Sequence, residues 1–207
     1  APATDLPDPF GGLNYERYIA IRVKPAGRIW EGEGRGFTAE PLPRGFVFTT
    51  PVALFTVEEG AVRRIVFDRT LFDLGDLQMP ANAPDPGFSG VRLASTSGGP
   101  DPFEFAIVQG ASFFRAAARG QNFGIIARAL TLKPAETKGE EFPAFRALWL
   151  ERPAAGSNAL TLHALVDTES VAGSVRMTFR PGEATIVDVE TTLFPRVALE
   201  HVGLGGM

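Results

Sequence analysis

Residues 171–193 read VAGSVRMTFRPGEATIVDVETTL, and this segment alternates in polarity on both sides of a Pro-Gly pair. Apolar or small residues occupy every second position before the pair, at Val171, Gly173, Val175, Met177 and Phe179. Side chains along a β-strand point alternately to opposite faces, so this period of two indicates two strands with one buried face each. Pro181 and Gly182 suit the central positions of a type II turn. The segment therefore predicts a β-hairpin.

The same pattern recurs along the chain, and it predicts further strands. They cover residues 18–23, 46–58 with a break near Pro51, 61–66, 91–94, 103–108, 113–118, 123–132, 145–151 and 160–166. No stretch longer than ten residues has a helical apolar stripe. Many short strands separated by turns are typical of a sandwich or barrel, so the fold class predicted is all-β.

Composition limits the classes of function. The 207 residues are 44% hydrophobic and 21% charged, with a net charge of −4, which gives no basic footprint for nucleic acid or an anionic membrane surface. No apolar run approaches the roughly 18 residues of a membrane span. Without cysteine there can be no disulfide or thiolate site, which suits a periplasmic protein and many cytosolic ones equally. We expect neither a nucleic-acid partner nor a membrane span, and the sequence indicates no particular oligomeric state.

Glu140 and Glu141 are candidate functional acids in an expected loop. A glycosidase needs two carboxyl groups facing each other across the scissile bond. Adjacent residues in extended chain point to opposite faces, so these two make poor partners for each other, although either could pair with a distant acid. The alternative is a solvated acidic turn.

Arg115 and Arg128 recur between apolar residues on expected strands. A guanidinium on a sheet face can bind sugar hydroxyls or orient a carboxylate, and it can equally be part of the scaffold. His163 and His201 are the only histidines, and they are not accompanied by acids at metal-ligand spacing. The sequence therefore predicts no metal and no cofactor.

Four strings within residues 110–153 occur in one order: GASFFR at 110–115, GQNFG at 120–124, GEEFPAFR at 139–146 and WLERP at 149–153. Together they resemble the periplasmic glucan biosynthesis family known as OpgG/OpgD or MdoG. Further matching blocks lie at residues 15–30, 45–52, 85–90, 164–167 and 180–189, so the resemblance covers nearly the whole chain.

The resemblance implies a large β-sandwich of the galactose-mutarotase supersandwich type, followed in the family by a small immunoglobulin-like domain. Residues 1–207 would be an incomplete part of the N-terminal sandwich, without the immunoglobulin-like domain. The family is periplasmic and is required for osmoregulated β-glucan production. Some members are β-1,2-glucan hydrolases that use an aspartate as general acid. The resemblance places the catalytic aspartates beyond Met207, so no catalytic residue is assigned here.

The resemblance also implies a β-glucan polysaccharide as the binding partner. The residues expected to contact it are Arg115, Gln121, Arg128, Glu140 and Glu141. The competing hypothesis is a non-catalytic carbohydrate-binding or scaffold β-sandwich that has lost hydrolysis. Several positions depart from the family pattern: Phe113 and Phe123 replace Tyr, Ile126 replaces Ser, Val175 replaces Tyr and Lys133 replaces Asp. Such changes weaken sugar contacts if the residues line a cleft, and they are drift in the core if the residues are packed.

Overall fold

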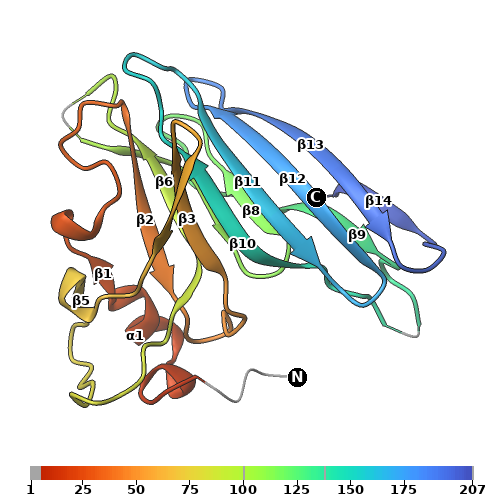
Figure 1. The fold of residues 1–207 in the computed structure, drawn as a ribbon, viewed down its shortest axis with the longest axis horizontal. Coiled ribbons are helices and arrows are strands. Elements are labelled where there is room, and N and C mark those ends of the chain that lie inside the picture. Colours follow the sequence, from red (N-terminus) through yellow and green to blue (C-terminus); the bar gives the residue numbers. More distant parts are fainter. Residues whose placement is uncertain (1–5, 100, 138, 207) are drawn as a thin grey trace.

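The computed structural model describes residues 6–99, 101–137 and 139–206, and it confirms an all-β sandwich. Two six-stranded sheets pack face to face (Figure 1). The first has the order β13 (Ile186–Pro195), β12 (Val171–Arg180), β11 (Leu160–Asp167), β10 (Ala144–Glu151), β3 (Ala53–Glu58), β4 (Ala61–Ile65). The second has the order β14 (Val202–Gly206), β9 (Ala127–Leu132), β8 (Phe113–Ala116), β7 (Phe103–Gln109), β6 (Phe88–Ser95), β2 (Phe37–Pro43). A separate two-stranded sheet pairs β1 (Arg22–Val23) with β5 (Phe72–Asp73).

The predicted hairpin is present as β12 and β13, paired antiparallel over their whole length. Its predicted apolar face on β12 is buried, whereas Arg176 and Arg180 on the other face are exposed. The type II turn is wrong: Gly182 lacks the positive φ that such a turn requires, and the connection is the five-residue loop 181–185. This loop is held by the β8–β9 connection instead, since Arg119 N donates to Gly182 O at 2.9 Å and Thr185 Oγ1 donates to Ala117 O at 2.7 Å.

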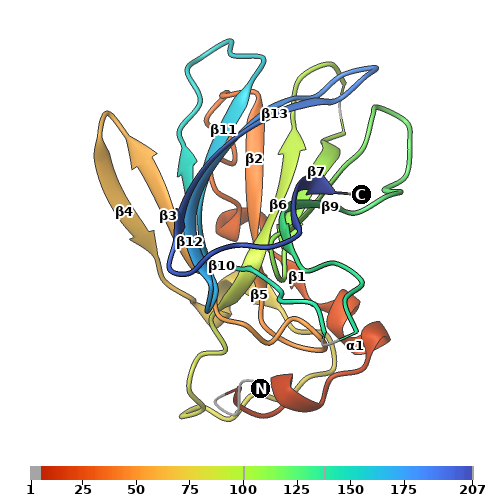
Figure 2. The same cartoon turned by 90° about the vertical axis from the view of Figure 1, so that its right-hand side faces the viewer.

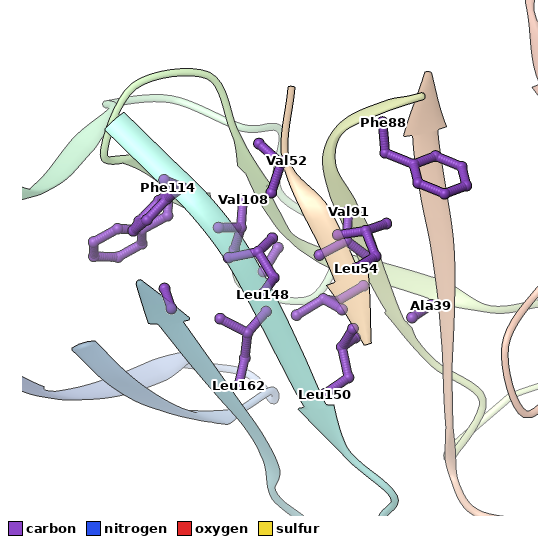
Figure 3. Close-up of a cluster of buried hydrophobic side chains, with 14 of the residues drawn as sticks. Ala39, Val52, Leu54, Phe88, Val91, Val108, Phe114, Leu148, Leu150 and Leu162 are labelled. Atoms are coloured by element: carbon purple, nitrogen blue, oxygen red, sulfur yellow. The ribbon is translucent and has the colours of Figure 1, made fainter. Parts of the chain in front are cut away.

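The two sheets face each other (Figure 2), and buried hydrophobic side chains pack between them (Figure 3). Leu148, Leu150 and Leu162 of the first sheet are fully buried, and they lie across from Val91 and Val108 of the second. Complete burial of one such side chain is worth about 1.5–3 kcal/mol. The inward position of these residues fixes which neighbouring side chains project from the outer faces.

The strand predicted at residues 18–23 is wrong over most of its length, because the chain forms the helix α1 (Tyr15–Ala20). Asn14 caps this helix: its side chain accepts a hydrogen bond from Arg17 N at 3.0 Å. Of the predicted residues, Arg22 and Val23 form a strand, β1. Three single turns of 3-10 helix accompany α1 and the small sheet: η1 (Phe10–Gly12), η2 (Pro25–Gly27) and η3 (Arg69–Leu71).

Strands β2 and β14 were not predicted, and two others begin later than predicted. β2 reads FTAEPLP, and six of its seven residues are buried, so burial on both faces hides the alternation. Its prolines are tolerated because β2 is at the edge of its sheet. β3 begins at Ala53 because residues 45–48 form a tight turn with Phe46 at a φ of 53°, and β9 begins only at Ala127. No helix in the described ranges is long and apolar enough to cross a membrane.

Candidate functional site

The outer face of the second sheet carries a row of polar side chains. Strand register aligns Glu40 of β2, Arg92 of β6, Ile107 of β7 and Arg115 of β8 across four strands. Their neighbours along the chain, such as Val108, point into the core, so this row projects outward. The face therefore presents charged groups around an apolar centre.

A pocket of about 380 Å³ lies on this face. Its floor includes Gln109, Phe113 and Arg115, and one wall is made by Tyr15, Phe46 and Phe48 from the N-terminal segment. The rings of Tyr15 and Phe46 have centroids 5.9 Å apart, and Tyr15 is 56% exposed. The pocket thus combines accessible aromatic surface with amide and guanidinium donors.

Tyr18 connects the aromatic wall to the sheet. Its hydroxyl donates to Pro43 O at 2.9 Å, and Gln109 Nε2 donates to that hydroxyl at 2.7 Å and to Ser89 Oγ at 2.9 Å. Burial raises the pKa of Tyr18 above its ordinary value, and the hydrogen bonds with Ser89 and Gln109 oppose that rise only in part. The hydroxyl is therefore neutral at physiological pH, and the network fixes both the wall and the Gln109 amide.

Arg115 and Arg128 come together on either side of Phe113. Arg128 lies directly opposite Phe113 in the β8–β9 pair, with its guanidinium carbon 5.6 Å from the ring centroid, and it forms an ion pair with Glu140. Arg115 makes no hydrogen bond or ion pair with any described residue. Three of the five residues proposed from the sequence, Arg115, Arg128 and Glu140, therefore cluster around one half-buried aromatic ring.

Glu141 points elsewhere. Its carboxylate accepts from Ser170 Oγ at 2.7 Å, from Ser170 N at 2.9 Å and from Thr168 Oγ1. Partial burial raises the pKa of Glu141, but the hydrogen bonds from Ser170 and Thr168 outweigh this and leave the pKa below its ordinary value. These hydrogen bonds hold the loop that precedes β10 against the turn between β11 and β12.

Gln121 is exposed in the turn that follows β8, where its backbone N–H donates to Ala118 O at 3.0 Å. Its side chain makes no hydrogen bond with any described residue, and it is not among the residues that line the pocket. Gln121 and Glu141 therefore stand apart from the cluster around Phe113.

A second, smaller hollow of about 180 Å³ continues along the same face. Here Glu40 joins two cations, with Arg28 Nε at 2.8 Å and Arg92 Nη1 at 3.3 Å from its two oxygens. Arg92 Nε also lies 3.6 Å from a carboxylate oxygen of Glu104. These charges neutralise one another, so this hollow extends the polar surface without a net charge. No group of three or more potential metal ligands occurs within the described residues.

Sequence reasoning did not identify Tyr15, Phe46 or Gln109 as site residues. Tyr15 and Phe46 reach the pocket from a helix and a turn that lie far from Arg115 in the chain. Gln109 is the last residue of β7, and the local sequence does not distinguish it from any other polar strand residue. Only the sheet register brings these three together.

All of residues 1–207 match the family described as periplasmic glucan biosynthesis protein, MdoG. The chain belongs to this family. Three similar proteins of the MdoG family are each named Glucans biosynthesis protein G. Those of Rhodopseudomonas palustris (strain BisA53) and Bradyrhizobium diazoefficiens are 40% identical over 100% of the chain, and that of Shewanella frigidimarina is 42% identical over 98%. The chain spans 42%, 41% and 37% of their respective lengths.

The departures from the MdoG pattern fall in different places. Phe113 and Ile126, expected in the family as Tyr and Ser, both line the pocket. Val175 is 1% exposed in the core, so its change is one of packing. Phe123 is half-buried in the β8–β9 connection and is not among the pocket residues. Phe113 and Ile126 therefore give this pocket apolar surface at positions where the resemblance leads us to expect hydroxyl groups.

Proposed function

We propose that this protein acts in the periplasm in glucan biosynthesis, and that the outer face of its second sheet binds β-1,2-linked glucan. Membership of the MdoG family and the names of its relatives support the role. The single observation that carries the choice of surface is a pocket that combines Phe113 with two polar groups. These are Arg115, which has no partner among the described residues, and the fixed amide of Gln109.

The chemistry of this pocket suits a sugar chain. A pyranose presents an apolar face of C–H groups and a rim of hydroxyls. The rings of Tyr15 and Phe113 offer flat apolar surface, and Arg115 and Gln109 offer donors at its border. Arg128 adds a third donor, held in place by Glu140. No cofactor is needed for such binding.

The second candidate function is a non-catalytic carbohydrate-binding role for this chain. The residues around the pocket in the described ranges include neither Asp nor Glu, and the nearby carboxylate of Glu140 is bound to Arg128. Glycoside hydrolysis requires a proton donor and a second carboxylate or an activated water. We therefore propose that this chain binds glucan, and that any processing of glucan is carried out by the whole protein.

The binding proposal is tested by titrating the chain with linear β-1,2-glucan in a calorimeter. We expect Phe113→Ala and Arg115→Ala each to weaken binding roughly tenfold, the loss that one stacking contact or one charged hydrogen bond provides. Arg63→Ala is the control, because Arg63, like Arg115, makes no hydrogen bond or ion pair with any described residue but lies on β4 of the other sheet. Equal affinity of all three variants would contradict the assignment of this face.

The catalytic question needs a separate measurement. We expect no reducing sugar to be released when the chain is incubated with linear β-1,2-glucan. Release that is abolished by Glu140→Gln would contradict the non-catalytic role and assign the proton donor to Glu140. General acid catalysis contributes about 10²–10⁴-fold, so the effect of that substitution would be unambiguous.

A further inference from the structure

Three arginines line a further pocket, which is separate from the two hollows on the outer face of the second sheet. It has a volume of about 580 Å³ and lies where β3, β4 and β10 meet the loop that precedes β6. Arg44, Arg64 and Arg146 come to it from three different parts of the chain. Neither the glucan-binding proposal nor the motifs of the sequence account for this convergence.

Two of these arginines have no partner in the described part of the protein. Arg64 lies on β4 opposite Phe55 of β3, and its guanidinium makes no hydrogen bond or ion pair there. The same holds for Arg146, which occupies the irregularity in the β10–β11 register between Phe145 and Ala147. A bulge redirects a side chain, and this one brings Arg146 to the pocket wall while Phe145 stays in the core.

The third arginine is fixed in place. Arg44 is 3% exposed, and its guanidinium donates from Nε to Thr49 O at 2.7 Å and from Nη1 to Pro86 O at 3.1 Å. Apolar residues complete the lining, among them Val52 and Phe88. Arg64 and Arg146 are both exposed, so their guanidinium groups are accessible to a ligand from solution.

The balance of charge in the pocket is positive, although the whole chain carries −4. Asp85 is the one carboxylate of the described residues that lines it. We propose that this pocket binds an oxyanion, a phosphate or carboxylate group, clamped between Arg64 and Arg146. The planar fork of a guanidinium fits both groups bidentately. This site is independent of the proposed glucan-binding face.

Titration with inorganic phosphate and, separately, with sodium acetate tests the proposal, with amide chemical shifts recorded by NMR at constant ionic strength. We expect at least one of the two anions to shift the amides around Arg64 and Arg146 saturably. Arg64→Gln and Arg146→Gln should each weaken that binding roughly tenfold, the loss expected for a charged hydrogen bond. Asp85→Asn should strengthen it, because it removes the only competing carboxylate of the described lining.

Arg63→Gln is the matched control, since Arg63 is adjacent to Arg64 and equally exposed but does not line the pocket. A selective loss in the Arg64 and Arg146 variants supports the site, and the stronger of the two anions identifies its ligand as a phosphate or a carboxylate. Absence of saturable shifts with both anions would overturn the proposal, as would an equal loss in the Arg63 variant, which indicates unspecific attraction.

Discussion

At the scale of single residues, Phe113 and Ile126 line the pocket beside Arg115 without hydroxyl groups, where the family resemblance leads us to expect Tyr and Ser. A hydroxyl on the pocket surface can both donate to and accept from a sugar, whereas these residues contribute only apolar contact. Because both residues line the pocket, adding a hydroxyl group at either position tests whether the pocket binds a sugar.

We therefore expect Phe113→Tyr and Ile126→Ser each to strengthen binding of linear β-1,2-glucan several-fold, since a hydrogen bond contributes about 0.5–1.5 kcal/mol net. Calorimetric titration measures the change. Phe123→Tyr adds a hydroxyl group outside the pocket and should leave the affinity unchanged. A gain in affinity for Phe123→Tyr alone would place the sugar elsewhere.

Glu141 is a residue whose contribution should depend on pH. Its folded-state pKa lies below the ordinary value of 4.5, so its ionised form stabilises the fold above that pH and the contribution is lost as the pH falls through the folded-state pKa. We expect Glu141→Gln to lower the free energy of unfolding by about 1 kcal/mol at pH 7, because charged hydrogen bonds are impaired but solvent screens this partly exposed group.

Urea unfolding from pH 7 to pH 3 follows this effect, and the difference from the unsubstituted chain should shrink below pH 4.5. Glu169→Gln provides the control, because Glu169 lies between Thr168 and Ser170 but is exposed. A deficit that stays constant down to pH 3 would show that the ionisation of Glu141 does not matter.

At the scale of elements, the sequence predicted the strands whose two faces meet different surroundings. The alternation of β11 and β12 is visible because one face packs in the core and the other reaches solvent. β2 could not be found this way, since both of its faces are buried.

α1 was misassigned because its six residues are too few to show a helical period, and the Asn14 cap determines it instead. The cluster of Arg115, Arg128 and Glu140 required the β8–β9 register, which local pattern does not contain.

Strands β6 and β7 approach each other so closely at Gly90 that a side chain there would collide with the neighbouring strand. A Cβ at Gly90 would lie 2.1 Å from Val108 O, a backbone atom that cannot move aside. We expect Gly90→Ala to lower the free energy of unfolding by about 1–3 kcal/mol, the usual cost of overpacking. Urea denaturation measures it against Gly124→Ala, where no atom lies within 4 Å of the added Cβ. Equal stabilities of the two variants would contradict the close approach of β6 and β7.

At the scale of the whole molecule, β13 and β14 form the edges of the two sheets at the same end of the sandwich, and each pairs with a single strand of the described residues (Figure 1). Large apolar side chains are exposed in this region at Ile186, Val189, Phe194, Val202 and Leu204. Unpaired strand edges with exposed apolar residues favour intermolecular pairing. We expect the isolated chain to self-associate at micromolar concentration.

Size-exclusion chromatography across a dilution series measures this association, and Val189→Lys should reduce it by placing a charge on the free β13 edge. Val62→Lys is the control, since Val62 is exposed on β4 at the opposite edge of the same sheet. A chain that elutes as a monomer at every concentration and melts reversibly would contradict the expectation.

The parallel contact between β3 and β10 determines when the first sheet can be completed. Ala53 of β3 pairs with Ala147 of β10. The hairpin of β3 and β4 forms early, but β3 gains its second neighbouring strand only after β10 has been synthesised. The antiparallel strands β6, β7 and β8 follow one another directly and need no such delay. Contacts between distant residues form slowly because loop closure costs entropy before any pairing compensates it. During synthesis on the ribosome, β4 should therefore acquire protection from hydrogen exchange later than β6, although it emerges first.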